Sequence, residues 1–331
     1  MIKTRQIGQT GLEVSELGLG TAAMAGNHRP VSEVDHRAAL KTGLDAGITY
    51  LDTAPFYGFT RSEHYAGDAL RDRRDWVLST KAGRLFKIGP APEHEAREWP
   101  GSFPFHQIYD YSYTGVMRSY EDSLQRLGLD RIDLLLLHDI GEMQHGVEAN
   151  KSLQADAMTG GYKALDELRR AGDIKAIGLG VNEKKVCIEA LDHGNWDTFL
   201  LAGRYTLLEQ TALDDLMPLC AAASTSLIIG GPFNSGILAG GDTWNYAKAP
   251  QDVLDHAKNL SRVCESHKVP LPAASLRFPL GEEMVSSVIP GPRSASEMQM
   301  IIDWWTMDIP SSLWSDLRNE GLLHPSAKVP A

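Results

Sequence analysis

The stretch DLLLLH, from Asp133 to His138, is the clearest indication of the fold. It is a short apolar run that ends on a polar side chain, and Gly128 closes the helical pattern before it. Continuous apolar runs of this length are typical of strands that are buried on both faces, as in a parallel sheet. The stretch therefore predicts a core strand over 133–137 that carries His138 at its carboxyl end.

Seven similar runs occur along the chain, and amphipathic stretches with helical spacing alternate with them. This alternation favours a parallel sheet with crossover helices. Helices that end before glycines such as Gly172 and Gly194 suit C-terminal capping. Eight strands in 331 residues predict an α/β fold, a single (β/α)8 TIM barrel domain over 1–331. The expected strands are 16–19, 49–52, 76–79, 133–137, 174–179, 198–201, 226–229 and 285–289, and the expected helices include 35–46, 113–127, 161–171 and 183–193.

Segments outside this alternation complete the expected architecture. Residues 3–6 and 13–14 flank the turn GQTG at 8–11, which predicts an N-terminal β-hairpin over the bottom of the barrel. Two long segments, 82–113 and 230–250, follow the third and seventh strands. Long loops in compact domains are usually functional or disordered, and barrel enzymes keep their sites at the C-terminal face.

Composition narrows the classes of function. The net charge of -11 and the lack of a dense Lys/Arg run argue against nucleic-acid binding as the main activity. No signal-peptide core and no apolar run of membrane thickness is present, so we expect a cytoplasmic protein that does not enter a membrane. The cysteines are far apart and form no CxxC pair, and the histidines have no metal-ligand spacing, so we expect neither a disulfide framework nor a metal site.

The main rival architecture is an open doubly wound sheet that binds a dinucleotide. That fold requires GxGxxG directly after an early strand and an acidic residue about 20 positions later. The segment 18–23 (GLGTAA) matches only the first half of this motif. The missing third glycine argues against the rival.

Four side chains suited to carbonyl chemistry stand at or after consecutive predicted strands: Asp52, Tyr57, Lys81 and His138. A tyrosine can exchange a proton with a substrate oxygen if a nearby cation lowers its pKa. The cation needs a carboxylate partner, and a histidine can orient the substrate by hydrogen bonding. Taken singly, each has a structural interpretation as a surface, buried or turn residue. Together, at the ends of neighbouring barrel strands, they predict one catalytic site.

The same residues carry a family resemblance. The segment 52–58 (DTAPFYG), the strand-end Lys81 and the run 133–138 resemble the tetrad motifs of the aldo-keto reductase superfamily. The likeness extends from 8–12 (GQTGL) to 289–293 (IPGPR), nearly the whole chain. It implies Tyr57 as general acid/base, Lys81 and Asp52 as the pair that tunes it, and His138 as the residue that orients the substrate.

The resemblance also implies an NAD(P)(H) site. Gly20 and Thr21 resemble the backbone contact on the nicotinamide side, and Asn182 resembles the amide that holds the carboxamide. The segment 231–238 (GPFNSGIL) resembles the loop that wraps the pyrophosphate, where backbone N–H groups can hold an anion. Its contributing residues are expected to be Pro232, Asn234, Ser235 and Gly236.

The segment 290–297 (PGPRSASE) resembles the adenosine-phosphate segment of the family. Members that prefer NADP tend to carry Lys and Arg where this chain has Gly291 and Glu297. A carboxylate repels a 2′-phosphate but can accept a hydrogen bond from a free ribose hydroxyl. Arg293 could still pair with a phosphate. We expect NAD to be favoured over NADP.

Two segments, 180–183 and 232–238, are similar to a branch of the family that includes D-threo-aldose 1-dehydrogenase, L-fucose dehydrogenase and pyridoxal 4-dehydrogenase. The branch implies oxidation of a cyclic hemiacetal, such as L-fucose or another D-threo-aldose, to its lactone. Phe56 is expected to contact the substrate, because it is next to Tyr57 in the sequence. Pyridoxal oxidation, general aldehyde or ketone reduction, and a catalytically silent cofactor-binding subunit remain the alternatives. Further candidates for the substrate wall are Trp99, His106, Tyr109, Trp244 and Asn234, and the oligomeric state stays open.

Overall fold

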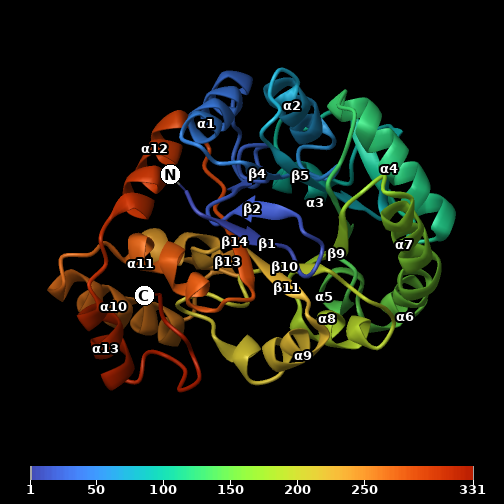
Figure 1. Ribbon diagram of the computed structural model, residues 1–331. Coiled ribbons are helices and arrows are strands. Elements are labelled where there is room, and N and C mark those ends of the chain that lie inside the picture. Colours follow the sequence, from blue (N-terminus) through green and yellow to red (C-terminus); the bar gives the residue numbers. More distant parts are fainter. Residues whose placement is uncertain (1, 331) are drawn as a thin grey trace.

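The centre of the computed structural model, which describes residues 2–330, is a ring of eight parallel strands (Figure 1). The strands follow one another around the ring in chain order. A parallel bridge from Leu17 to Val288 joins the two ends, so the sheet closes into the expected barrel. The barrel strands are β3 (Leu19–Gly20), β4 (Tyr50–Asp52), β5 (Val77–Ala82), β8 (Leu134–His138), β9 (Ala176–Val181), β10 (Thr198–Ala202), β11 (Ser226–Gly230) and β14 (Val285–Ile289).

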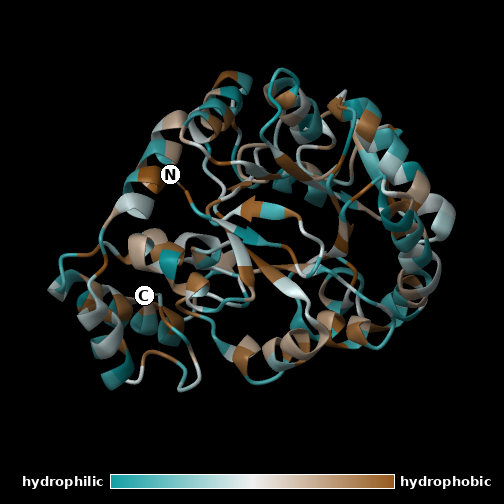
Figure 2. Ribbon diagram, in the orientation of Figure 1, coloured by the Kyte–Doolittle hydropathy of each residue, from teal (hydrophilic) through white to brown (hydrophobic). Residues whose placement is uncertain are grey.

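Helices surround the ring, and hydrophilic residues cover much of the outer surface of α4 and α7 (Figure 2). The predicted helix 113–127 is confirmed as α4, and Gly128 ends it in the left-handed region at φ 60°. The main covering helices are α1 (Glu33–Asp45), α2 (Arg61–Leu70), α4 (Tyr113–Leu127), α7 (Tyr162–Ala171), α8 (Lys184–Leu191), α9 (Leu216–Ala223), α11 (Leu271–Arg277) and α12 (Ala295–Thr306). Four others are α5 (Glu142–His145), α6 (Val147–Asp156), α10 (Gln251–Ser266) and α13 (Ser311–Asn319).

The N-terminal hairpin is also confirmed. Strands β1 (Thr4–Gln6) and β2 (Glu13–Ser15) pair in antiparallel fashion, and Figure 1 shows them across the centre of the ring. Ile7 and Val14 are fully buried in one apolar cluster with residues of the barrel strands. The hairpin therefore plugs the N-terminal end of the barrel by burying apolar surface.

Most boundaries differ from the prediction by one to three residues, and two of the differences have a clear physical reason. The first barrel strand begins at Leu19 rather than at residue 16, because the backbone of Glu16 pairs with Lys3 of the hairpin and with Val288. Helix α8 ends at Leu191, and Gly194 does not cap it. Gly194 instead lies against the ring of Tyr162, which a Cβ would meet at 2.2 Å.

The two long segments have regular structure of their own. Residues 82–113 hold an antiparallel hairpin, β6 (Arg84–Ile88) and β7 (Phe105–Tyr109), with helix α3 (Glu93–Glu98) between its strands. Residues 230–250 hold a short 3-10 segment and the hairpin of β12 (Thr243–Trp244) and β13 (Ala247–Lys248). Both segments rise from the carboxyl ends of barrel strands, so they can form walls around that end.

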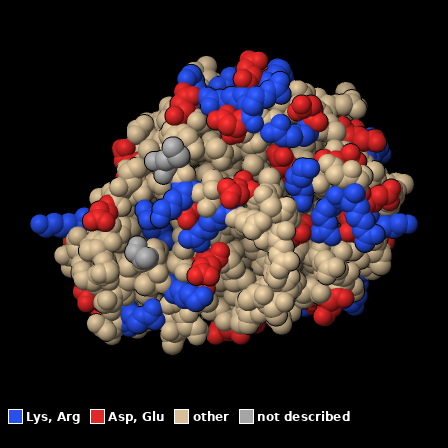
Figure 3. Space-filling model, viewed as in Figure 1, with Lys and Arg blue, Asp and Glu red and all other residues tan. Residues whose placement is uncertain are grey.

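The surface is charged with both signs. Figure 3 shows acidic and basic side chains interspersed on the face that carries the hairpin. Within residues 2–330, no helix is both long enough and apolar enough to cross a bilayer.

Candidate active site

A cavity of about 360 Å³ lies at the C-terminal end of the barrel, where β4, β5 and β8 end. Tyr57, Lys81 and His138 all line it. Asp52 lies behind Lys81 rather than on the lining. The structure therefore brings the four predicted catalytic side chains to one place, as neighbouring parallel strands require.

The lysine and the aspartate form a buried ion pair. Lys81 and Asp52 side chains are 1% and 2% exposed, and the Lys81 Nζ donates to Asp52 Oδ1 at 2.5 Å. The same ammonium donates to the Thr53 carbonyl at 3.0 Å, and Ser79 Oγ donates to Asp52 Oδ1. Gly180 on β9 leaves room for the lysine, because a Cβ there would lie 2.8 Å from Lys81 Cε. Such a pair is held in place because both charges would otherwise be uncompensated.

Tyr57 stands beside this pair in the loop after β4. Its ring is stacked on Trp99 with centroids 5.7 Å apart and an interplanar angle of 20°. The Lys81 Nζ lies 5.6 Å from the centre of the Tyr57 ring. Burial, and then the carboxylates of Asp52 and Asp139, raise the pKa of Tyr57 well above its ordinary value. The phenol is therefore protonated at neutral pH.

His138 ends strand β8, and its ring meets the edge of Tyr57 at 5.7 Å with an angle of 82°. Its carbonyl accepts a hydrogen bond from the Tyr111 hydroxyl at 2.6 Å, which fixes the strand end. Burial, followed by the charges of Arg84 and Lys81, lowers the pKa of His138 well below its ordinary value. A neutral imidazole beside a phenol and a buried ammonium can hold a substrate oxygen and move a proton to or from it.

Sequence reasoning missed a second buried ion pair, between Arg84 and Asp139. Asp139 Oδ2 lies 3.4 Å from His138 Nε2, and Arg84 lies 3.9 Å over the ring of Phe56. Asp139 directly follows His138, and Arg84 lies three positions after Lys81. A charged residue close to each of these two predicted strand ends was the signal available in the sequence. The pairing itself depends on the turn of the chain at Gly83, between β5 and β6.

The three residues expected at the nicotinamide end are placed near this cavity. Asn182 lines it, and its Nδ2 lies 3.5 Å from Asp139 Oδ1. The Thr21 hydroxyl donates to the Asp52 carbonyl at 2.9 Å, so its side chain joins the ends of β3 and β4. Gly20 donates from its backbone to the Pro290 carbonyl at 3.0 Å. Thr21 and Gly20 therefore brace the strand ends, and any cofactor contact from them must come from the backbone.

The loop after β11 holds the second predicted group. The buried Asn234 uses its side chain within the protein, where Nδ2 donates to the Gly203 carbonyl at 3.0 Å and Oδ1 accepts from Thr206. Ser235 Oγ accepts from the Tyr246 N–H at 3.0 Å and so ties this loop to the β12–β13 hairpin. Pro232 is buried, and Gly236 has φ 105°, with Thr243 Oγ1 as the nearest atom to a Cβ there at 3.8 Å. The backbone N–H groups of Asn234 and Gly236 also donate within the loop, to the carbonyls of Gly231 and Phe233.

Arg293 and Glu297 lie at the N-terminus of α12. Glu297 Oε2 accepts from the Arg293 backbone N–H at 2.7 Å, and Oε1 lies 3.3 Å from the Arg29 guanidinium. The Ser294 hydroxyl caps the helix by accepting from the Glu297 N–H at 3.2 Å. Arg293 Nε is buried without a partner. Glu297 thus already serves two donors of this protein, which the sequence did not show.

Only part of the predicted substrate wall lines the cavity. Phe56 and Trp99 do, whereas the other candidates are not among the lining residues: His106, Tyr109, Trp244 and Asn234. Gln107 lines it in place of His106, because side chains alternate along a strand and Gln107 is on the other face of β7. The β12–β13 hairpin contributes Tyr246 from its turn instead of Trp244, and the same cavity is also bounded by Asn27, His28, Glu95, Glu98 and Gln144.

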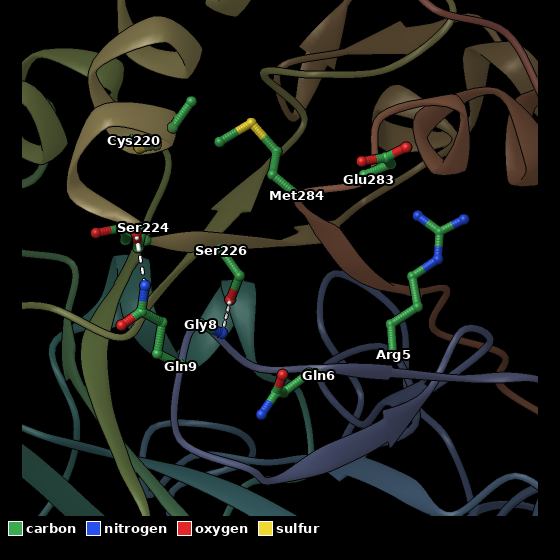
Figure 4. Close-up of a pocket in the computed structure, with 11 residues that line it drawn as sticks. Arg5, Gln6, Gly8, Gln9, Cys220, Ser224, Ser226, Glu283 and Met284 are labelled. Carbon is green, nitrogen blue, oxygen red and sulfur yellow. Dashed lines mark hydrogen bonds between the residues drawn. The ribbon is translucent and has the colours of Figure 1, made fainter.

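A larger cavity, of about 610 Å³, lies at the N-terminal end between the hairpin, α9 and the start of β14 (Figure 4). Several of its polar groups are paired within the protein: Gln9 Nε2 donates to Ser224 Oγ at 2.9 Å and the Gly8 N–H donates to Ser226 Oγ at 3.1 Å. Among the described residues, none of the buried polar atoms without a partner belongs to its lining. Size alone would select this cavity, but the chemistry lies at the other end.

The chain is similar to known proteins over nearly its whole length. It is 44% identical to a pyridoxal 4-dehydrogenase from Microbacterium luteolum, with 96% of this chain and 97% of the relative covered. It is 35% identical to a D-threo-aldose 1-dehydrogenase from a Pseudomonas species, with 95% and 96% covered. An aldo-keto reductase from Bacillus halodurans in its holo form superposes with a TM-score of 0.74 at 25% identity, with 99% and 98% covered. The model of the aldo/keto reductase family matches residues 16–319, and the chain belongs to this family.

Proposed function

We propose that this oxidoreductase oxidises a cyclic hemiacetal to its lactone, with NAD favoured as the hydride acceptor. One observation carries the proposal: Tyr57 and His138 face the cavity together, and the buried Lys81–Asp52 pair stands beside the phenol. The intact set argues against a catalytically silent subunit, because a protein that only binds has no need of a buried ammonium next to a tyrosine.

Aldo-keto reductases use NAD(P)(H), and the residues present fit such a group. Arg293 has a buried donor without a partner at the N-terminus of α12, where phosphates are readily bound. Asn182 at the cavity offers an amide to a carboxamide, and the left-handed backbone of Asn234, Ser235 and Gly236 in the loop after β11 resembles the turns that cradle a pyrophosphate. When bound, the nicotinamide supplies hydride transfer. Gly20, Thr21, Pro232, Asn234 and Ser235 would contribute by position and backbone.

The side chains at the site provide for the transfer of the substrate's proton. In the oxidative direction Tyr57 takes the proton of the hemiacetal hydroxyl. The carbon that bears this hydroxyl would lose its hydride to the nicotinamide, and its C–O bond would become the lactone carbonyl. Lys81 favours the phenolate that takes this proton, and Asp52 holds the ammonium in position. The neutral His138 hydrogen-bonds the substrate oxygen without competing for the proton.

Two substrates of the same chemical kind are candidates. The more similar of the two relatives named above acts on pyridoxal and the other on a D-threo-aldose, and both substrates form cyclic hemiacetals. The aromatic wall of Phe56, Tyr57 and Trp99 suits the face of a flat pyridine ring or the apolar face of a sugar. General aldehyde or ketone reduction is the broader alternative, because the same residues serve the reverse direction.

Turnover by the purified protein tests the proposal. We expect reduction of NAD with pyridoxal or with aldoses such as L-fucose, and a loss of about 10²- to 10⁴-fold in kcat for Tyr57→Phe. Cofactor affinity and thermal stability should be unchanged in that variant, since only one hydroxyl is removed. If no hemiacetal is oxidised, or if Tyr57→Phe is fully active, the proposal is wrong.

Cofactor preference is a separate measurement. A carboxylate at Glu297 disfavours a 2′-phosphate, so kcat/KM should be higher with NAD than with NADP. Glu297→Gln removes the charge and should narrow this ratio, with Glu320→Gln on the surface as a control. A clear preference of the unaltered protein for NADP would contradict the argument from Glu297, because Arg29 and Arg293 would then bind the phosphate.

A further inference from the structure

Helix α3 presents two polar side chains to the cavity from outside the catalytic set. Glu95 and Trp99 are four residues apart, and the backbone N–H of Trp99 donates to the backbone carbonyl of Glu95 at 2.9 Å. Residues at this spacing lie on one face of a helix. Both side chains are buried and both line the cavity. The segment inserted after β5 thus contributes polar side chains to one wall of the cavity.

Each of these two side chains has one polar atom without a partner. Glu95 Oε2 and Trp99 Nε1 are buried and make no hydrogen bond within the protein. Leaving a buried polar group unpaired is unfavourable, and native proteins rarely tolerate it without a reason. One atom is an acceptor and the other a donor, so together they match a ligand group that both donates and accepts.

The remaining atoms of this wall are held rigidly. Gln107 Nε2 donates to Glu95 Oε1 at 2.8 Å, and Arg84 donates to Gln107 Oε1 at 2.8 Å. Arg84 also pairs with Asp139, whose carboxylate lies beside His138. A continuous line of hydrogen bonds therefore runs from Asp139, beside His138, through Arg84 and Gln107 to Glu95. This line fixes one carboxylate oxygen of Glu95 and leaves the other without a partner.

We propose that Glu95 and Trp99 determine specificity by binding a hydrogen-bond donor on the substrate ring, away from the carbon that is oxidised. The donor is a hydroxyl group of a sugar or the N–H of a pyridinium. A sugar hydroxyl uses both atoms, since it donates to Glu95 and accepts from Trp99. A pyridinium N–H uses Glu95 alone, and its positive charge strengthens that bond. The assignment rests on the proposed function for the identity of the ring.

Glu95→Gln tests the assignment, because Gln107 would hold the amide oxygen and leave an N–H donor where the carboxylate oxygen was. We expect KM for pyridoxal or L-fucose to rise about 10- to 100-fold, with little change in kcat. Reduction of propanal, which has no ring and no donor, should not change. Glu93→Gln, on the exposed side of the same helix, is the matched control and should behave as the unaltered protein.

Trp99→Phe separates the two sources of the donor. It keeps an aromatic ring but removes the N–H, so KM for L-fucose should rise while KM for pyridoxal changes less. The assignment would be overturned if Glu95→Gln had the same KM as the unaltered protein for both pyridoxal and L-fucose. It would also be overturned if KM for propanal rose as much as KM for these two substrates.

Binding gives a readout that does not depend on turnover. Calorimetric titration with pyridoxal and with L-fucose, in a Tyr57→Phe background with NAD present, should show the same weakening on addition of Glu95→Gln. If rings bind but are not oxidised by the unaltered protein, the proposed function fails and the specificity assignment stands. If neither ring binds, the assignment itself is wrong.

Discussion

The two ends of the barrel each hold a cavity, and they differ in the state of their polar groups. At the N-terminal end, no described residue that lines the larger cavity has a buried polar atom without a partner, and Gln9, for example, pairs with Ser224. At the C-terminal end the smaller cavity is lined by Lys81, buried in an ion pair with Asp52, and by His138, whose Nδ1 has no partner. The N-terminal end closes the barrel and stabilises it, whereas the C-terminal end holds buried charges and an unpaired polar atom that reduce stability.

Unpaired and charged buried groups therefore identify the site better than cavity volume does. Buried charges and unpaired polar atoms reduce stability, so they persist where a ligand or a reaction uses them. Substitutions at the C-terminal end should therefore reduce activity more than their effect on folding explains. Substitutions at the N-terminal end should reduce stability and leave the activity of each folded molecule unchanged.

The largest effect is expected from Lys81→Met. Removing the ammonium leaves Asp52 buried without a counter-ion, which should lower the free energy of unfolding by about 3–5 kcal/mol. The loss should shrink as pH falls, because a protonated Asp52 needs no counter-ion. Urea denaturation at several pH values measures this, and turnover should be lost at all of them.

A double variant separates the two effects of that substitution. Adding Asp52→Asn to Lys81→Met removes the second charge, so most of the stability should return while turnover stays lost. Recovery of activity together with stability would mean that the pair is only a structural feature, and the contrast between the barrel ends would fail.

Gly8→Ala probes the N-terminal end with a smaller effect. Gly8 has φ +48°, and a Cβ there would meet the Asp197 carbonyl oxygen at 2.6 Å. We expect a loss of about 2–3 kcal/mol in the free energy of unfolding, from backbone strain and the clash together. Gly11→Ala in the same hairpin has φ +75° but no clash, since the nearest atom to a Cβ there is Gln6 Nε2 at 3.9 Å, so it should lose only about 1 kcal/mol. A drop in kcat of folded Gly8→Ala would contradict the assignment of this end to stability.

The pH profile gives a comparison that needs no substitution. The raised pKa of Tyr57 keeps the phenol protonated at neutral pH. Oxidation needs the phenolate, so its kcat/KM should rise with pH, by about tenfold per unit, without a plateau below about pH 10. Reduction needs the phenol and should stay level over the same range. Since the pKa of His138 is lowered, neither profile should bend near pH 6.5, and a bend there would show that His138 titrates in the free protein.

Much of the fold could be predicted from the sequence, because its signals are local. The run 134–138, the helix 113–127 with its cap at Gly128, and the hairpin turn at 8–11 each record a burial pattern in consecutive residues. The start of the first barrel strand was misplaced, because residues 16–18 are shared between the hairpin and the last strand. Such sharing depends on closure of the ring and leaves no local pattern.

The candidate site likewise has features that could be predicted from local sequence and features that depend on contacts distant in the chain. The side chains at the ends of β4, β5 and β8 could be predicted, because the strand period and the chain order place them on one face. Three features depend on the packed structure: Arg84 pairs with Asp139, the Asn234 side chain bonds to Gly203 and Thr206 in the loop after β10, and Glu95 keeps one oxygen without a partner. These are contacts between residues that are distant in the chain, and their geometry is set by packing rather than by any repeat in the sequence.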